Sequence, residues 1–167
     1  MDNLHNKIKI NNRRGIILKF TVGYIRKGDE FLFMYRNKKK NDINKGKYIG
    51  VGGHIESGET PEECIIREAY EETGLKIENP HMLGQVFYEQ EDGYTEEMYV
   101  FYIDKYQGEL HDSDEGDLKY MTPEEFYRKP HWIGDELFLK YVFENREFGK
   151  FKLKYNGDEL VEVEHEQ

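Results

Sequence analysis

The sequence predicts an α/β fold, in which a mixed β-sheet carries helices on both faces. Apolar and aromatic segments with strand character occur in pairs around short turns, and capped or amphipathic helical segments lie between those pairs. Strands and helices interleave without the regular strand-helix-strand repeat of a purely parallel sheet, which favours a mixed one. The 167 residues show no composition shift that would mark a linker, so we expect one domain over residues 1–167, with residues 1–15 as a polar N-terminal extension.

The first two strands are predicted over residues 18–26 and 31–36, joined by a turn with Gly28 and Asp29 at its centre. Arg36 ends the second strand and opens a basic segment. That segment is either an ordinary solvated loop or a surface that attracts a triphosphate. We expect Arg36 to bind substrate; the other basic residues are Lys38, Lys39, Lys40, Lys45 and Lys47.

A helix is predicted after the glycine-rich loop 50–53. Thr60 can cap the free amides, Pro61 suits the first helical position, Glu63 completes a capping box, and Gly74 supplies a left-handed stop. The loop itself is either a tight turn or a place where the backbone approaches a ligand or metal closely.

This helix has two dissimilar arcs at about 100° per residue. The arc expected to be buried carries Ile65, Ile66, Ala69 and Tyr70, and the opposite one carries Arg67, Glu68, Glu71 and Glu72. Three carboxylates at this spacing repel one another, so something should compensate them. The alternatives are a solvated acidic face with Arg67 as counter-ion, or a site for a hard cation such as Mg²⁺, which prefers carboxylate oxygens.

The second half of the chain adds two strand pairs and two helices. Strands are predicted over residues 82–91 and 95–106, followed by a short helix that Thr122 caps. An amphipathic helix is predicted over residues 135–144, and a hairpin over residues 150–163 turns at Asn156-Gly157.

Composition limits the classes of function. A formal net charge of −10 argues against a long nucleic-acid track, whereas a small anionic substrate remains possible if metal ions screen it. The chain shows neither a signal-peptide core nor a membrane span, and we expect it to be cytoplasmic, without a membrane partner. Its single cysteine, Cys64, excludes an internal disulfide and is interpreted as a bystander rather than a nucleophile.

Residues 53–75 read GHIESGETPEECIIREAYEETGL. This stretch resembles the Nudix box, the signature of hydrolases that cleave nucleoside diphosphates linked to another group. Further short motifs, in the same order, resemble landmarks of the MutT-type 8-oxo-dGTP diphosphatases: residues 48–54, 83–86, 100–102, 107–108, 113–115 and 132–135. The resemblance implies a Nudix-like α/β/α sandwich and metal-dependent hydrolysis of a nucleoside triphosphate, such as 8-oxo-dGTP, to nucleoside monophosphate and pyrophosphate, in nucleotide-pool sanitation.

The resemblance also implies a set of metal-site residues. Mg²⁺, or alternatively Mn²⁺, would be held by Glu68, Glu71, Glu72, Glu115 and the carbonyl of Gly52. Glu68 or Glu115 would act as the base toward water. Arg67 would hold Glu68, and Glu59 would anchor the preceding loop to the helix. Glu115 has an alternative interpretation as one more acid in a solvated loop.

For the nucleobase, the resemblance implies that Trp132 stacks on a purine and that Asp135 hydrogen-bonds its edge. The alternatives are a core tryptophan and a helix N-cap aspartate. Two positions depart from the vertebrate-type pattern: Ile49 stands where an amide would read the base, and Gly134 where a second acid would stand.

Three other functions fit the sequence. The first is a Nudix hydrolase for another small nucleotide, such as ADP-ribose, a dinucleoside polyphosphate or an ordinary dNTP. The second is a catalytically silent Nudix-like module that binds nucleotides or proteins. The third is an acidic protein-interaction domain. The oligomeric state is left open between monomer and homodimer.

Overall fold

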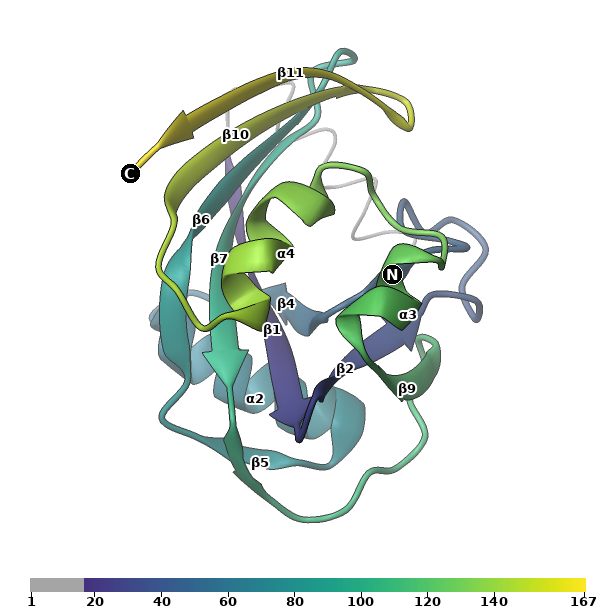
Figure 1. Ribbon diagram of the computed structural model, residues 1–167, viewed down its shortest axis with the longest axis vertical. Coiled ribbons are helices and arrows are strands. Elements are labelled where there is room, and N and C mark those ends of the chain that lie inside the picture. Colours follow the sequence, from purple (N-terminus) through teal and green to yellow (C-terminus); the bar gives the residue numbers. More distant parts are fainter. Residues whose placement is uncertain (1–16) are drawn as a thin grey trace.

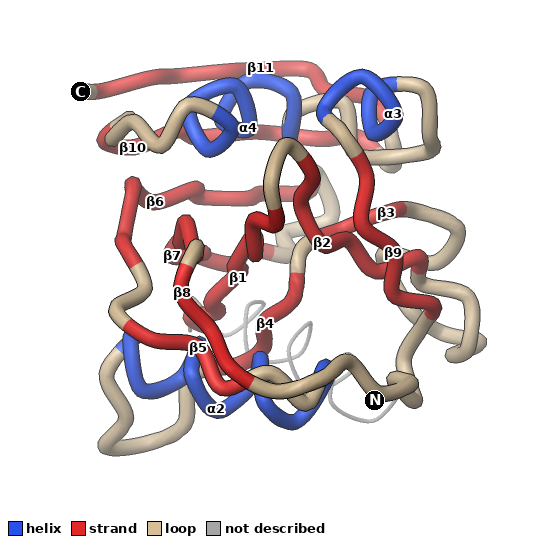
Figure 2. Tube along the Cα trace, turned by 60° about the horizontal axis from the view of Figure 1, so that its bottom comes forward, coloured by secondary structure: helices blue, strands red, loops and turns tan. Residues whose placement is uncertain are grey.

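The computed structural model describes residues 17–167, so the extension expected over residues 1–15 lies outside the described residues. A mixed sheet lies between helix α2 (Pro61–Thr73) on one face and helices α3 (Pro123–Tyr127) and α4 (Asp135–Phe143) on the other (Figure 1). Figure 2 shows these layers from the side, with α3 and α4 above the central strands β6, β7, β1 and β2, and α2 below them, while β10 and β11 lie at the height of α4. The predicted α/β/α sandwich is therefore confirmed.

The sheet mixes parallel and antiparallel pairs. Strand β1 runs parallel to β7, and β10 runs parallel to β6, whereas the other pairs are antiparallel. The main path runs in the order β11 (Glu159–Glu166), β10 (Gly149–Asn156), β6 (His81–Gln90), β7 (Thr95–Ile103), β1 (Leu18–Lys27), β2 (Glu30–Tyr35), β3 (Tyr48–Ile49). Off this path, β4 (Val51–His54) pairs with β1 and β9 (Asp117–Met121) with β2, while β5 (Lys76–Glu78) and β8 (Lys105–Gln107) form a separate ribbon.

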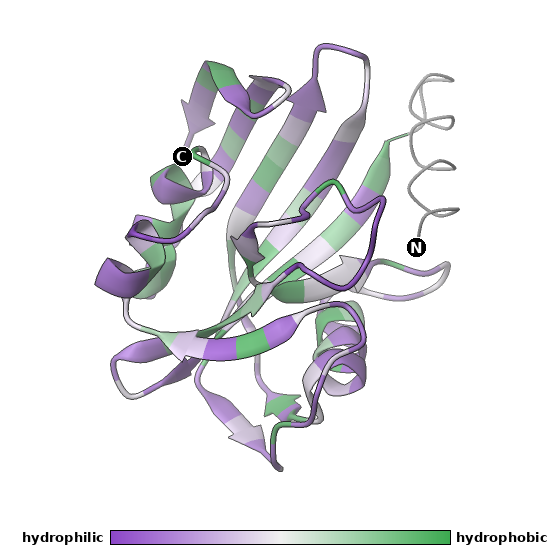
Figure 3. Cartoon of the chain, turned by 90° about the vertical axis from the view of Figure 1, so that its right-hand side faces the viewer, coloured by the Kyte–Doolittle hydropathy of each residue, from purple (hydrophilic) through white to green (hydrophobic). Residues whose placement is uncertain are grey.

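Each face of the sheet covers its own hydrophobic core, because successive strand residues point to opposite faces. On β7, Val100 and Tyr102 belong to the core under α4, whereas Phe101 and Ile103 belong to the core under α2. Figure 3 shows the corresponding alternation of hydrophobic and hydrophilic bands along the central strands. Trp132 joins the core on the α4 side.

The predicted hairpins β1–β2, β6–β7 and β10–β11 are confirmed, as are the two capped helices and the amphipathic α4. Two predictions are wrong in detail. The glycine-rich loop 50–53 contains most of strand β4, which pairs with β1, and the segment 95–106 is broken at Asp104 into β7 and β8. Four short strands, β3, β4, β5 and β9, are not predicted by the sequence, because they form through pairing with distant strands rather than through local propensity.

The buried face of α2 also differs from the prediction. Ile66 and Tyr70 are 40% and 51% exposed, whereas Glu72 is only 8% exposed. The residues that α2 buries are Cys64, Ile65, Ala69, Glu72 and Thr73. The helix is thus rotated so that a carboxylate, rather than a tyrosine, faces the sheet, and this places Glu72 beside β4.

Among residues 17–167, no helix is long and apolar enough to cross a membrane.

Candidate functional site

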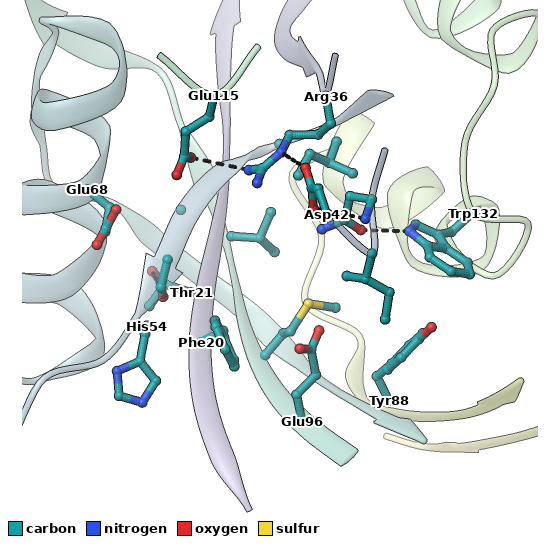
Figure 4. Close-up of a pocket in the computed structure, with 18 of the residues that line it drawn as sticks. Phe20, Thr21, Arg36, Asp42, His54, Glu68, Tyr88, Glu96, Glu115 and Trp132 are labelled. Carbon is teal, nitrogen blue, oxygen red and sulfur yellow. Dashed lines mark hydrogen bonds and ion pairs between the residues drawn. The ribbon is translucent and has the colours of Figure 1, made fainter. Parts of the chain in front are cut away.

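A cavity of about 450 Å³ opens on the sheet and gathers most of the residues that the sequence singles out. This volume lies within the range of about 300–1,000 Å³ typical of small-molecule sites. In Figure 4, Glu68 and Glu115 lie at one side of the cavity and Trp132 and Tyr88 at the other. Seven predicted site residues line it: Arg36, Gly52, Glu68, Glu72, Glu115, Trp132 and Asp135. The two others, Arg67 and Glu71, do not line it.

Local signals in the sequence set the two ends of helix α2, which lies at the edge of this cavity. The hydroxyl of Thr60 accepts a hydrogen bond from the Glu63 amide at 3.1 Å, and the Glu63 carboxylate accepts one from the Thr60 amide at 3.0 Å. Gly74 ends the helix with a φ of 81°, which is accessible to glycine without strain. The predicted capping box and C-terminal stop are confirmed.

Glycines let strand β4 approach both strand β1 and the carboxylates of α2. A Cβ at Gly52 would overlap the carbonyl oxygen of Thr21, and a Cβ at Gly53 would lie 2.5 Å from the carboxyl carbon of Glu68. The Gly52 amide lies 3.4 Å from Glu72 Oε2, to which it donates. Gly52 therefore contacts the acidic set through its N–H group, and its carbonyl as a metal ligand, which the family resemblance implies, stays a prediction.

Arg67 ties the loop before α2 to the helix carboxylates. Its guanidinium donates to Glu59 at 2.7 and 2.9 Å, to Glu68 at 2.7 Å and to the His54 carbonyl at 3.2 Å. Glu71, 57% exposed, accepts from Arg67 at 3.3 Å. The hydrogen bond from Arg67 lowers the pKa of Glu59 to about 2. The predicted contact of Arg67 with Glu68 is present, and Glu59 links the loop to the helix through Arg67.

The acidic end of the cavity holds carboxyls that resist ionisation. Burial raises the pKa of Glu68. The pKa of Glu72 is raised well above its usual range, first by burial and then by the neighbouring charges of Glu115 and Glu68. Such a set is stable when it takes up a proton or when a cation lies among its oxygens.

The donor chemistry of this end fits a hard divalent cation, since carboxylate oxygens are its preferred ligands. In the described part of the chain, no three His, Cys, Asp or Glu side chains are gathered in a geometry that holds a metal ion. Glu68 is paired with Arg67 instead, and Glu115 with Arg36 at 3.2 Å. A cation would therefore compete with two arginines for these oxygens.

Arg36 lies at the middle of the cavity wall, with its side chain 6% exposed. Its Nε donates to Asp42 Oδ2 at 2.5 Å, and its Nη1 donates to Glu115 Oε2 at 3.2 Å. The side chain of Glu115 is 22% exposed and faces the cavity. The interpretation of Glu115 as an acid in a solvated loop is therefore wrong. Arg36 is buried, so the interpretation of the basic segment as an ordinary solvated loop does not apply to this residue.

Trp132 belongs both to the core and to the cavity wall, so the two interpretations of this residue are not exclusive. The side chain is 7% exposed, and its ring meets Tyr88 and Tyr155 edge to face at 5.7 and 5.1 Å between centroids. The Lys47 ammonium lies 4.3 Å from the ring centroid. The indole N–H donates to Asn44 Oδ1 at 2.8 Å.

Asp135 is not a helix cap. The N-cap of α4 is Gly134, which makes no side-chain cap hydrogen bond, and Asp135 is the first helical residue. Its side chain lines the cavity at 9% exposure. Burial, followed by the charge of Glu96, raises the pKa of Asp135 to about 8. The N-cap interpretation is therefore wrong.

Sequence reasoning missed Glu96, which also lines the cavity, as Figure 4 shows. It accepts a hydrogen bond from the Tyr94 hydroxyl at 2.5 Å, and burial raises the pKa of Glu96 to about 7. A signal was present in the sequence. Glu96 shares the strand face of Met98 and Val100, so an acid occupies a position that alternation assigns to the core. Asp42 and Asn44, also missed, lie in an irregular loop and carried no such signal.

The buried acids predict how stability depends on pH. An unfolded Asp titrates near ~3.9 and an unfolded Glu near ~4.3, far below the folded values of about 8 for Asp135 and about 7 for Glu96. Because the folded state then binds more protons than the unfolded one, the unfolding free energy should fall as pH rises from about 4 to about 8.

In wild type the unfolding free energy should be lower at about pH 8 than at about pH 5. In Asp135→Asn this difference should be smaller by on the order of a few kcal/mol. Denaturant titrations at both pH values measure it, and Asp104→Asn, at an exposed position, is the matched control. An Asp135→Asn difference equal to that of the control would contradict the burial argument.

Comparisons with known proteins agree with this architecture. The family model described as NUDIX domain matches residues 19–142. The oxidized purine nucleoside triphosphate hydrolase of Danio rerio is 32% identical over 130 residues, which cover 76% of this chain and 81% of the relative. The ADP-ribose pyrophosphatase of Methanocaldococcus jannaschii is 37% identical over 95 residues, which cover 56% of this chain and 54% of the relative.

A solved structure, the MutT protein of Bacillus halodurans, superposes with a TM-score of 0.79 at 24% identity, covering 89% of this chain and 97% of that chain. This likeness concerns the fold. The family match and the Danio rerio relative establish that the chain belongs to the Nudix hydrolase family. The family resemblance of residues 53–75 is confirmed.

Proposed function

We propose that this protein hydrolyses a nucleoside triphosphate to nucleoside monophosphate and pyrophosphate, with an oxidised purine deoxynucleotide such as 8-oxo-dGTP as substrate. The observation that carries the proposal is that one cavity has an acidic end and an aromatic end. Glu68, Glu72 and Glu115 can hold cation-bound phosphates at the first, and Trp132 can stack on a base at the second. The Danio rerio relative is named for hydrolysis of oxidised purine nucleoside triphosphates, which supports this substrate class.

The acidic end would hold Mg²⁺, or Mn²⁺, through Glu68, Glu71, Glu72, Glu115 and the Gly52 carbonyl. The bound ion supplies neutralisation of phosphate charge and stabilisation of the leaving oxygen.

Protein side chains activate the water and bind the phosphates. Glu68 or Glu115 orients water and takes its proton as the water attacks phosphorus. Arg67 keeps the Glu68 carboxylate in place by a charge-assisted hydrogen bond, 2.7 Å long. Arg36, between Glu115 and Asp42, lies where it can also donate to a phosphate oxygen.

At the aromatic end, Trp132 stacks on the purine and Asp135 meets its edge. With a pKa of about 8, the Asp135 carboxyl carries a proton at neutral pH and can donate as well as accept a hydrogen bond. An acid of this kind can complement a base edge that presents both a carbonyl and an N–H group.

Ile49 lines the cavity without a polar side-chain atom. Ile49→Asn should therefore raise the preference for 8-oxo-dGTP over dGTP, because the amide supplies a hydrogen-bonding group to the base. The ratio of kcat/KM values for the two nucleotides measures the effect, with Ile49→Leu as an apolar control. An unchanged ratio in Ile49→Asn would place the base away from β3.

A substrate panel in Mg²⁺ with product identification by mass spectrometry tests the proposal. The panel holds 8-oxo-dGTP, the ordinary dNTPs, ADP-ribose and a dinucleoside polyphosphate. We expect 8-oxo-dGTP to have the highest kcat/KM and to yield monophosphate and pyrophosphate. Preference for ADP-ribose would favour the activity for which the Methanocaldococcus jannaschii relative is named. Absence of turnover with every compound would leave a silent nucleotide-binding module or an acidic interaction domain.

A further inference from the structure

A continuous chain of hydrogen bonds joins the two ends of the cavity. It starts at Glu115, which accepts from Arg36 at 3.2 Å, and Arg36 donates in turn to Asp42 at 2.5 Å. The other oxygen of Asp42 accepts from the backbone amide of Asn44 at 3.0 Å. The side-chain oxygen of Asn44 accepts from the indole N–H of Trp132 at 2.8 Å. Figure 4 shows this chain crossing the cavity wall from the carboxylates to the tryptophan.

Asp42 lies at the centre of the chain and uses both carboxylate oxygens. Oδ2 faces the guanidinium of Arg36 and Oδ1 faces the amide of Asn44. The side chains of Asp42 and Arg36 are 5% and 6% exposed, so water has little access to this ion pair. Removing one partner of a buried charged pair leaves the other uncompensated and free to turn elsewhere. Asp42 thus determines where the Arg36 guanidinium points.

At the aromatic end, the hydrogen-bond chain adds a directional contact to the packing of Trp132. Tyr88 and Tyr155 meet the Trp132 ring edge to face, which holds the ring through apolar contacts. The hydrogen bond from the indole N–H to Asn44 fixes which way the N–H edge of the ring points. The loop that carries Asn44 is itself held by the contact of its amide with Asp42.

We propose that Asp42 is a positioning residue for both ends of the cavity, because it orients Arg36 beside the acidic set and, through Asn44, orients the Trp132 ring. This inference rests on the proposed function, in which phosphates and base occupy those two ends. It implies that the loop 41–44 couples base binding to catalysis. Neither Asp42 nor Asn44 belongs to the Nudix-box stretch, residues 53–75.

Two substitutions separate the two halves of the hydrogen-bond chain, one leading from Asp42 to Arg36 and the other leading through Asn44 to Trp132. Asn44→Ala removes the acceptor for Trp132 but keeps the backbone amide that faces Asp42, so KM should rise about tenfold with kcat within about twofold of wild type. Asp42→Asn retains only one acceptor oxygen and cannot serve both partners. For Asp42→Asn, KM should rise and kcat should fall, lowering kcat/KM by roughly 10–100-fold, as for other residues that orient a reactive group.

The control is Asp29→Asn, which makes the same chemical change in the exposed turn between β1 and β2. Melting temperatures of the three variants separate loss of fold from loss of position. Trp132 is the only tryptophan of the chain, so its fluorescence emission reports its surroundings without nucleotide. We expect the emission maximum to shift in Asn44→Ala and in Asp42→Asn, and to stay unchanged in Asp29→Asn.

The outcomes are distinct. Emission shifts together with the two different kinetic patterns support the role of Asp42. Kinetic constants of Asp42→Asn equal to those of Asp29→Asn would overturn the role, even if emission shifts, and so would identical kinetic patterns for Asp42→Asn and Asn44→Ala. Unchanged emission in Asp42→Asn would overturn it without any substrate. Absence of turnover by the wild-type protein would overturn the proposed function alone, because the emission comparison would still decide whether Asp42 orients Trp132.

Discussion

Glu72→Gln is expected to lower turnover by about a hundredfold or more while making the metal-free protein more stable. The variant removes a negative ligand, and a cation contributes several kcal/mol to stabilising phosphate charge, at about 1.4 kcal/mol per factor of ten. Glu72 is 8% exposed and its pKa is raised well above its usual range. Its ionised form therefore opposes folding, and the uncharged amide does not.

Steady-state kinetics in Mg²⁺ and denaturant titration in chelator at about pH 8 measure the two effects. Glu71→Gln should lose turnover as well but gain little stability, since Glu71 is 57% exposed. Glu62→Gln, at an exposed position in the first turn of the same helix, is the matched control and should change neither. Near-normal turnover in both Glu71→Gln and Glu72→Gln would refute the metal-site assignment.

Trp132→Ala is expected to weaken nucleotide binding by ~1–3 kcal/mol, the range for stacking of a base on an aromatic side chain. It should also lower the melting temperature, because Trp132 packs against Tyr88 and Tyr155 in the core. Trp132→Phe keeps a flat ring but lacks the N–H group that Asn44 accepts, so it should weaken nucleotide binding by about as much as Asn44→Ala does, about tenfold.

Equilibrium binding of a non-hydrolysed nucleotide, measured well below the melting temperature, separates the two contributions. If Trp132→Ala is destabilised but binds nucleotide as tightly as wild type, the tryptophan is a core residue only. The oxidised-purine assignment would then give way to a broader Nudix pyrophosphatase.

The parts of the fold that short-range signals encode were predictable from the sequence. Thr60, Pro61, Glu63 and Gly74 specify the start and end of α2 within fifteen residues of one another, and the structure shows the contacts that the capping box requires. Asn156-Gly157 likewise predicts the last hairpin. In the structure Asn156 pairs with Glu159, so the two-residue turn is Gly157-Asp158, one residue later than predicted, with a φ of 63° at Gly157.

The parts that failed depend on partners distant in sequence. Periodicity placed Tyr70 in the core, but the pairing of β4 with β1 fixes the surface that α2 meets, and Glu72 is buried there instead. Glycine is a poor strand former in isolation, so β4 was expected to be a loop.

The same limit applies to the site. The conspicuous acids of α2 were recognisable from the sequence. Asp42 and Asn44 are noticeable only through their contacts with Arg36 and Trp132, which lie six and 88 residues away from them respectively. No local pattern distinguishes such loop residues from a solvated turn.

Hydrolysis in ¹⁸O-labelled water tests the proposed reaction most directly. The resemblance to the MutT-type diphosphatases implies that water attacks the β-phosphorus, so that the nucleoside monophosphate is the leaving group. With 8-oxo-dGTP and Mg²⁺, mass spectrometry of both products should find the label in pyrophosphate and none in the nucleoside monophosphate. Label in the monophosphate would mean attack at the α-phosphorus, and would contradict the proposed reaction.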